Sequence, residues 1–186
     1  LMWREIVELS RPKNVVLAAI TVPLGAHLAL SGAWSTQALS LVALQTTSAI
    51  CFMAAGNTLN DIADVSIDKE AKPNKPIPAQ RVSIDQATKI AYSFSLLSAT
   101  FMAVGAYFSD EPIPIVLIWS LAAFLMYTYD SGFQTKKMGL LGNIAISLMV
   151  GAVIVFGAAS VSRADTELVL YASVVAFFAN LAREII

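Results

Sequence analysis

Four residues with oxygen-bearing side chains stand close together where the second long apolar run ends: Asn60, Asp61, Asp64 and Asp68. If the helix continues through them, they share one broad face, because residues four apart on a helix are neighbours. Like charges at this spacing destabilise a helix unless something positive neutralises them. Mg²⁺ suits such hard oxygen ligands and binds through carboxylates together with substrate phosphates. We therefore predict a metal–diphosphate site here; the alternative is an acidic helix end facing water.

Four cations follow these carboxylates within a proline-rich segment. Three prolines between positions 73 and 78 prevent a continuous helix, so the segment is expected to be a loop. Lys72, Lys75 and Arg81 on that loop could bind a phosphate-rich ligand above the acidic residues. The alternative is that these cations only mark the side of the membrane on which the loop lies.

A second polar connection carries Tyr129, Lys136 and Lys137. The tyrosine could approach a ligand at the mouth of the helices, and the lysines could reach its phosphate. Interfacial tyrosines and lysines are also ordinary membrane anchors, so both interpretations stay open.

These residues are set between long apolar segments. The chain of 186 residues is 57% hydrophobic and 13% charged, whereas soluble domains carry about 25% charged residues. Because a spanning helix needs about 20 apolar residues, the pattern predicts an all-α, polytopic transmembrane helical bundle forming one domain over 1–186. The six expected spans are 14–31, 37–59, 84–108, 113–129, 139–161 and 167–185.

The basic residues predict the orientation of these spans. Under this threading Arg163 alone falls on one side, and the other eleven Lys and Arg residues fall on the opposite side. The chain is expected to be an integral, multi-pass protein of the cell membrane. The positive-inside rule then places its N-terminus and the acidic site on the cytoplasmic side. Nothing suggests a nucleic-acid partner, and the oligomeric state is not readable.

The end of the sixth span echoes the end of the second. Asn180 aligns with Asn57, and Glu184 aligns with Asp61. Repeated halves that meet at a central site are a common membrane design. We expect the natural protein to continue with a second acidic cluster within about ten residues of Ile186, by analogy with Asp64 and Asp68.

The motif Asn60-Asp61-x-x-Asp64-x-x-x-Asp68, followed by Lys72-Pro73-Asn74-Lys75-Pro76-Ile77-Pro78-Ala79 and Arg81-Val82-Ser83, resembles the UbiA superfamily of intramembrane prenyltransferases. The chain would supply six of nine family helices. Three further stretches are similar to the archaeal-type digeranylgeranylglyceryl phosphate synthases: Arg11-Pro12-Lys13-Asn14, Tyr129…Lys136-Lys137…Gly142-Asn143 and Asn180-x-x-Arg183-Glu184-Ile185-Ile186. Gln80 stands where the family usually has glycine, and the family's second Asp-rich motif is absent from the chain.

The resemblance implies Mg²⁺-dependent transfer of a prenyl group, here geranylgeranyl, from its diphosphate to a lipophilic acceptor such as geranylgeranylglyceryl phosphate. Asn60, Asp61, Asp64 and Asp68 would be the catalytic metal-site residues. The substrate-binding residues would be Arg81, Lys72, Lys75, Tyr129, Lys136, Lys137 and Asn14, with Asn14 near the acceptor. An aromatic acceptor in quinone-type biosynthesis is the alternative.

Two other classes use clustered membrane carboxylates. CDP-alcohol phosphotransferases carry a motif that begins Asp-Gly and passes through Ala-Arg, and this sequence lacks it. A cation transporter would place ionisable residues near mid-membrane, whereas here they lie at the ends of the expected spans. Isoprenyl diphosphate binding that requires Mg²⁺ would distinguish a prenyltransferase from a transporter.

Overall fold

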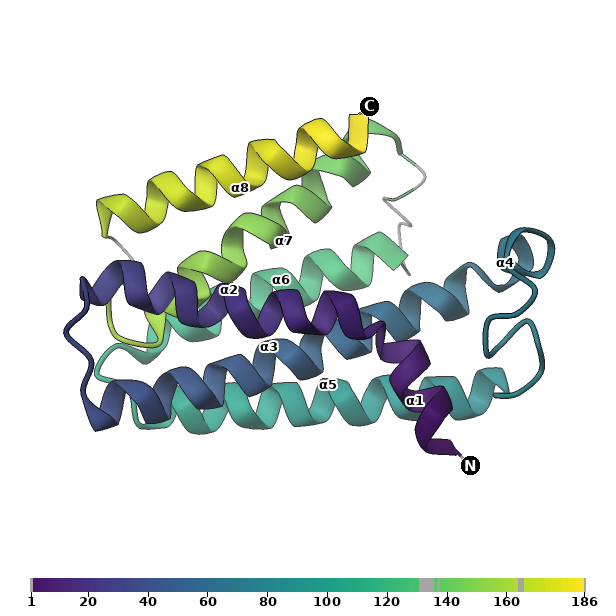
Figure 1. The fold of residues 1–186 in the computed structure, drawn as a ribbon, viewed down its shortest axis with the longest axis horizontal. Helices are drawn as coiled ribbons and strands as arrows, with labels where there is room; N and C mark the ends of the chain where they lie inside the picture. The colour runs from purple at the N-terminus through teal and green to yellow at the C-terminus, as the bar shows by residue number, and fades with distance from the viewer. Residues whose placement is uncertain (1, 131–135, 137, 164–165, 186) are drawn as a thin grey trace.

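The computed structural model describes residues 2–130, 136, 138–163 and 166–185. Within them the chain forms eight α-helices (Figure 1): α1 Met2–Ser10, α2 Pro12–Leu30, α3 Thr36–Ala63, α4 Val65–Ala71, α5 Ile84–Tyr107, α6 Pro112–Asp130, α7 Leu140–Ala159 and α8 Glu167–Ile185. Six of these, α2, α3 and α5 to α8, are long and apolar enough to cross a membrane. The predicted all-helical bundle with six spans is confirmed: the chain is an integral, multi-pass membrane protein.

Local signals in the sequence explain where the spans begin. The Ser35 side chain caps α3 by accepting a hydrogen bond from the backbone N–H of Ala38 at 3.1 Å. Ser83 and Gln86 form a capping box at the start of α5, each side chain accepting from the other residue's backbone N–H. Proline occupies the first position of both α2 and α6, where its missing N–H leaves no hydrogen bond unmade.

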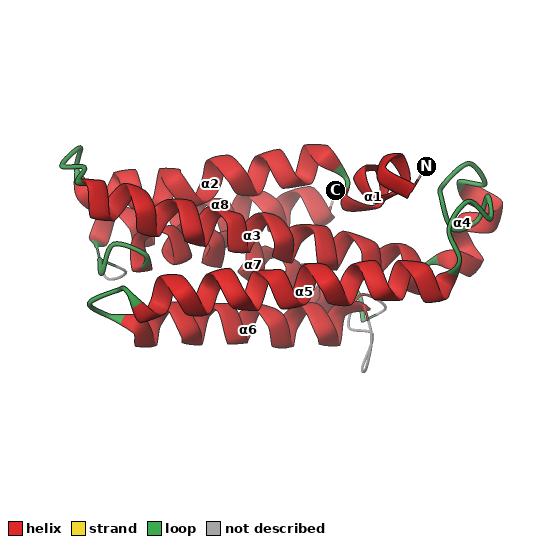
Figure 2. Ribbon diagram, turned by 90° about the horizontal axis from the view of Figure 1, so that it is seen from below, coloured by secondary structure: helices red, strands yellow, loops and turns green. Residues whose placement is uncertain are grey.

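The long helices run side by side (Figure 2), and α3 packs against α5, α2 against α7, and α7 against α8. Small residues make the closest approach possible. A Cβ on Gly25 would lie 2.0 Å from the carbonyl oxygen of Ile154, and a Cβ on Gly157 would lie 2.1 Å from that of Val22. Glycine at both positions therefore lets α2 and α7 meet backbone to backbone, as small residues do in membrane helix pairs.

The helix that carries the acidic motif is not continuous. α3 ends at Ala63, and Asp64 is a break with φ −94° and ψ 8° before the short α4 begins. The condition for one shared helical face, that the helix continues through Asp68, is therefore not met. The break turns α4 away from the α3 axis, so the carboxylates are positioned by two helices and not by the periodicity of one.

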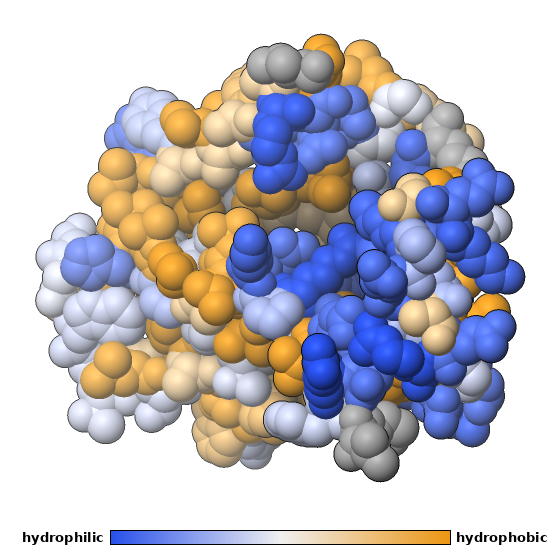
Figure 3. All heavy atoms as spheres, turned by 45° about the vertical axis from the view of Figure 1, so that its right-hand side comes forward, coloured by the Kyte–Doolittle hydropathy of each residue, from blue (hydrophilic) through white to orange (hydrophobic). Residues whose placement is uncertain are grey.

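The six spans alternate in direction, and most of the charged residues lie at one end of the bundle. α2, α5 and α7 begin there, and α3, α6 and α8 end there; we call it the polar end. Figure 3 shows hydrophilic residues gathered around a hollow at this end, with hydrophobic residues over the adjoining flanks.

Candidate active site at the polar end

Lys75 joins two of the predicted metal-site carboxylates. Its ammonium donates hydrogen bonds to Asp61 at 2.9 Å and to Asp68 at 2.6 Å. Both carboxylate side chains are only 5% exposed, and the lysine is 21% exposed. Burial disfavours the charged ammonium, but the hydrogen bonds to Asp68 and Asp61 outweigh it and raise the pKa of Lys75. Lys75 is therefore a fixed positive charge between two nearly buried negative ones.

The proline-rich loop holds Lys75 in this position. Ile77 and Val82 are buried against Leu9 of α1 and Ala87 of α5, which anchors the middle of the loop to the bundle. The backbone N–H groups of Arg81 and Val82 both donate to the carbonyl of Pro76, at 3.0 and 3.2 Å. The loop thus folds back over the end of α3 and brings its lysine to the acidic residues.

Lys136, like Lys75, places its ammonium between two carboxylates, and we call each such arrangement a junction. Its ammonium lies 2.7 Å from Asp64 and 3.4 Å from Asp130, the last residue of α6. The Asp130 side chain is only 6% exposed and also accepts a hydrogen bond from the amide of Asn60 at 2.9 Å. Asn60 thereby links the Lys136 junction to the neighbouring residues of α3.

Arg11 completes the network from the start of α2. Its guanidinium donates to Asn60 at 2.8 Å and forms an ion pair with Asp61. Arg11 has φ 51°, a left-handed conformation that bends the chain between α1 and α2. This bend directs the side chain inward, over the polar end.

Asn14, one turn further along α2, donates to the side chain of Asn57 at 3.1 Å. Asn57 in turn donates to the carbonyl of Ser10 at 2.7 Å. These contacts tie α1, α2 and α3 together beside the charged network.

Other predicted substrate-binding residues lie outside these junctions. Arg81 pairs with Glu8 of α1 at 2.8 Å, and its hydrogen bonds hold the pKa of the Glu8 carboxyl below its usual value. Lys72 is exposed at the end of α4, and Tyr129 is half-buried near the end of α6. Lys137 lies outside the described residues, so its predicted role remains a prediction, as do those of Arg81, Lys72 and Tyr129.

The repeat predicted from Asn57 and Asn180 has a structural counterpart in the pairing of α7 with α8. Both asparagines are 7% exposed. Asn180 donates to Ser147 of α7 at 3.0 Å, as Asn57 is joined to Asn14 of α2. Asn143, at the start of α7, donates to the backbone carbonyl of Glu184 at 3.0 Å. Two helix pairs therefore present polar residues at corresponding positions near the polar end.

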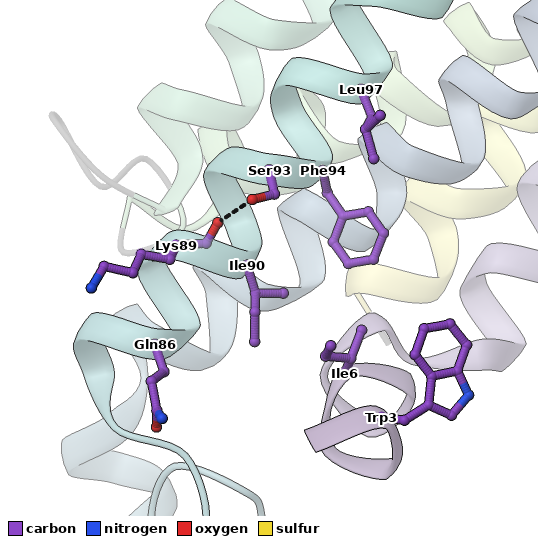
Figure 4. Close-up of a pocket in the computed structure, with 8 residues that line it drawn as sticks. All are labelled: Trp3, Ile6, Gln86, Lys89, Ile90, Ser93, Phe94 and Leu97. Carbon is purple, nitrogen blue, oxygen red and sulfur yellow. Dashed lines mark hydrogen bonds between the residues drawn. The ribbon is translucent and has the colours of Figure 1, made fainter. Parts of the chain in front are cut away.

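A separate apolar groove of about 420 Å³ lies between α1 and α5. In Figure 4 Trp3 and Ile6 face Ile90, Phe94 and Leu97 across it. None of the residues that line the groove belongs to the charged network.

The carboxylate and amide oxygens of the network are ligand types that a divalent cation takes, but in the part of the chain that the structure describes they are not gathered into a metal site. Among the described residues, no three acidic, histidine or cysteine side chains gather closely enough to hold a metal ion. The carboxylates instead flank the ammonium groups of Lys75 and Lys136, where positive charge is already accommodated. Carboxylate and amide oxygens are what Mg²⁺ prefers, so an ion could replace a lysine among Asn60, Asp61, Asp64 and Asp68.

Sequence reasoning did not assign Arg11 and Asp130 to the site. Both are charged residues at the end of a span, where charge is ordinary, so their type and position alone gave no signal. Their partners lie 49 and 70 residues away along the chain. Only the packing of α2 and α6 against α3 brings them to Asn60.

Residues 9–185 match the model of the UbiA prenyltransferase family. The chain is 34% identical over 183 residues to digeranylgeranylglyceryl phosphate synthase of Pyrococcus horikoshii, covering 96% of this chain and 60% of the relative. It is 31% identical over 180 residues to the enzyme of that name from Methanococcus aeolicus, covering 97% and 60%. The chain thus spans about 60% of the length of these relatives.

Two solved structures share the fold. One is a digeranylgeranylglyceryl phosphate synthase in membranes, which superposes with a TM-score of 0.76 at 23% identity, over 97% of this chain and 59% of that one. The other is a UbiA homolog from Archaeoglobus fulgidus bound to GPP and Mg²⁺, with a TM-score of 0.65 at 17% identity, over 96% and 60%.

Proposed function

Because the chain belongs to the UbiA prenyltransferase family, we propose that the protein transfers a prenyl group from an isoprenyl diphosphate to a lipophilic acceptor within the membrane. The donor is geranylgeranyl diphosphate and the acceptor is geranylgeranylglyceryl phosphate, as in ether-lipid synthesis. The relatives named digeranylgeranylglyceryl phosphate synthase, at 31 to 34% identity, support this choice of substrates.

The observation that carries the proposal is the alternation of carboxylates and lysines at the polar end. Asp61 and Asp68 flank Lys75, and Asp64 and Asp130 flank Lys136. A diphosphate with bound Mg²⁺ has the same alternation of charge, so it can exchange with these pairs. The carboxylates that bind the metal then face the cation, and the ammonium groups of the lysines face the phosphate oxygens.

Mg²⁺ held by Asn60, Asp61, Asp64 and Asp68 would supply Lewis-acid stabilisation of the departing diphosphate. A homolog of the same fold is bound to GPP and Mg²⁺, which supports the choice of cofactor. Lys75 and Lys136 neutralise the negative charge that develops on the leaving oxygens as the allylic C–O bond breaks. Lys72, Lys137 and Tyr129 contact the same diphosphate.

Breaking of that bond sends its electron pair to the diphosphate and leaves an allylic carbocation. The acceptor hydroxyl oxygen forms the new C–O bond with a lone pair and passes its proton to the released diphosphate. Asn14, beside the network on α2, is positioned to contact the acceptor. The apolar walls of the helices exclude water, which would otherwise capture the cation.

The polar end lies on the cytoplasmic side of the cell membrane, with the N-terminus on the same side. The distribution of Lys and Arg supports this orientation, since all but Arg163 fall at the polar end under the six-span threading.

The acceptor is tested by offering the protein labelled geranylgeranyl diphosphate and Mg²⁺ with geranylgeranylglyceryl phosphate and 4-hydroxybenzoate in competition. We expect the label in the glyceryl product. Label in the aromatic product would keep the reaction class and overturn the acceptor. Absence of label from both products would contradict prenyl transfer altogether.

Arg81 offers a sharper test of the loop, because its structural partner can be removed independently. Glu8→Gln breaks the closer of the two ion pairs of Arg81 and leaves the pair with Glu5 at 3.6 Å, and a partly exposed pair of this kind contributes less than about 1 kcal/mol. If Arg81 binds the diphosphate, Arg81→Gln raises the KM for geranylgeranyl diphosphate well above the value for Glu8→Gln. Equal KM values for the two variants would assign Arg81 to anchoring α1 only.

A further inference from the structure

Asp130 is a nearly buried carboxylate that is neither a proposed metal ligand nor a proposed substrate-binding residue. It ends α6, its side chain is 6% exposed, and it bonds to the nitrogen of the Asn60 amide, whereas Arg11 bonds to the oxygen. Its oxygen Oδ1 accepts from the Asn60 amide at 2.9 Å and lies 3.4 Å from the Lys136 ammonium. The same oxygen of Asp130 therefore contacts both Asn60, a predicted metal ligand, and Lys136, a residue predicted to bind the diphosphate.

The contact with Asn60 determines which way its amide faces. A side-chain amide carries an accepting oxygen and a donating nitrogen on the same carbon, and the two point in different directions. Because Asp130 can only accept while ionised, the Asn60 nitrogen must point to α6, and its oxygen must point to the side of Arg11 and Asp61. Only that orientation presents an oxygen to a cation bound beside Asp61 and Asp64.

The contact with Lys136 has a complementary effect. Lys136 follows α6 in the chain and is held between Asp130 and Asp64, the residue at the break between α3 and α4. A cation that binds Asp64 removes one of these two partners from the lysine. Asp130 remains, so the ammonium stays beside the site while the diphosphate binds.

We propose that Asp130 is a positioning residue of the metal–diphosphate site: it fixes the Asn60 amide with its oxygen toward the metal and retains Lys136 when the metal engages Asp64. The inference rests on the proposed function, since it assigns Asp130 its role through Asn60 and Lys136.

The test uses Asp130→Ala, which removes both contacts, and Asp130→Asn, which keeps an oxygen for Asn60 and loses the charge that holds Lys136. Thr128→Val is the matched control, since Thr128 is buried at the same end of α6 and its hydroxyl bonds only within that helix. Mn²⁺ serves as the probe for the metal, with free ion counted by its EPR signal, and steady-state assays give kcat and KM separately.

We expect Asp130→Ala to raise the Kd for Mn²⁺ and the KM for geranylgeranyl diphosphate by about 10- to 100-fold, the range for residues that orient metal ligands. Asp130→Asn should lie between Asp130→Ala and the wild type, and Thr128→Val should match the wild type. A wild-type Kd for Mn²⁺ in both Asp130 variants, with only kcat or protein yield reduced, would overturn the inference. Failure of the wild type to transfer any label would instead overturn the proposed function.

Discussion

Asp64→Asn is expected to lower kcat for prenyl transfer on the order of 10³-fold while the protein stays folded, the scale at which removal of one group facing the developing charge is felt. Asp64 stands at the break between α3 and α4, and its side chain reaches Lys136 at 2.7 Å. The neutral amide keeps the shape of the side chain but removes the charge that attracts the metal. Labelled product formed per unit time, at saturating Mg²⁺, measures the loss.

Asp85→Asn is the matched control for that substitution. Asp85 is also an aspartate bound to a lysine at 2.7 Å, but its pair with Lys89 is exposed and lies within the first turns of α5. Its neutralisation should leave kcat within about twofold of the wild type, because exposed pairs of this kind contribute little. Similar losses in the two variants would remove Asp64 from the site.

Lys75→Met should destabilise the metal-free protein and increase its response to Mg²⁺. Without the ammonium, Asp61 and Asp68 are left side by side with 5% exposure each and less positive charge to neutralise them. Breaking a buried pair costs about 3–5 kcal/mol, and the partial exposure of Lys75 reduces this to about 2–3 kcal/mol. Thermal unfolding in detergent with EDTA should therefore show a lower Tm than the wild type.

Added Mg²⁺ should raise the Tm of Lys75→Met by more than it raises that of the wild type, because the ion no longer competes with a lysine for the same carboxylates. Lys89→Met provides the control, since its exposed partner needs no replacement cation. A Tm for Lys75→Met that falls in EDTA and does not recover with Mg²⁺ would mean that the two carboxylates are not a metal site.

The spans could be predicted closely from the sequence, because hydropathy and capping act locally. The start of α5 was expected at 84 and lies at Ile84, after the capping box of Ser83 and Gln86. The end of α3 was harder to place. Nothing in the residues around Asp64 marks a break, since alanine and isoleucine precede it and no glycine or proline stands nearby. At the break, Asp64 contacts Lys136, which lies 72 residues further along the chain.

The sequence predicted that these polar residues lie together, but not which charges pair with one another. Asn60, Asp61, Asp64 and Asp68 were recognised from their spacing, and all four lie within one network at the polar end. Lys75 pairs with Asp61 and Asp68, and Lys136 pairs with Asp64. These pairings depend on how the loops fold back over the ends of the helices. Arg81 illustrates the limit, because its charge and position resemble those of Lys75, yet it pairs with Glu8 of α1.

The most direct test of a metal–diphosphate site at the polar end is the binding of geranylgeranyl diphosphate to the protein, measured by calorimetry in Mg²⁺ and again in EDTA. We predict binding in Mg²⁺ that weakens at least about 100-fold in EDTA, and a comparable weakening for Asp64→Asn in Mg²⁺, as expected when metal-bridged phosphate contacts are lost. Equal affinity in the two buffers, or no binding in either, would contradict the assignment of these carboxylates and lysines to a prenyl diphosphate.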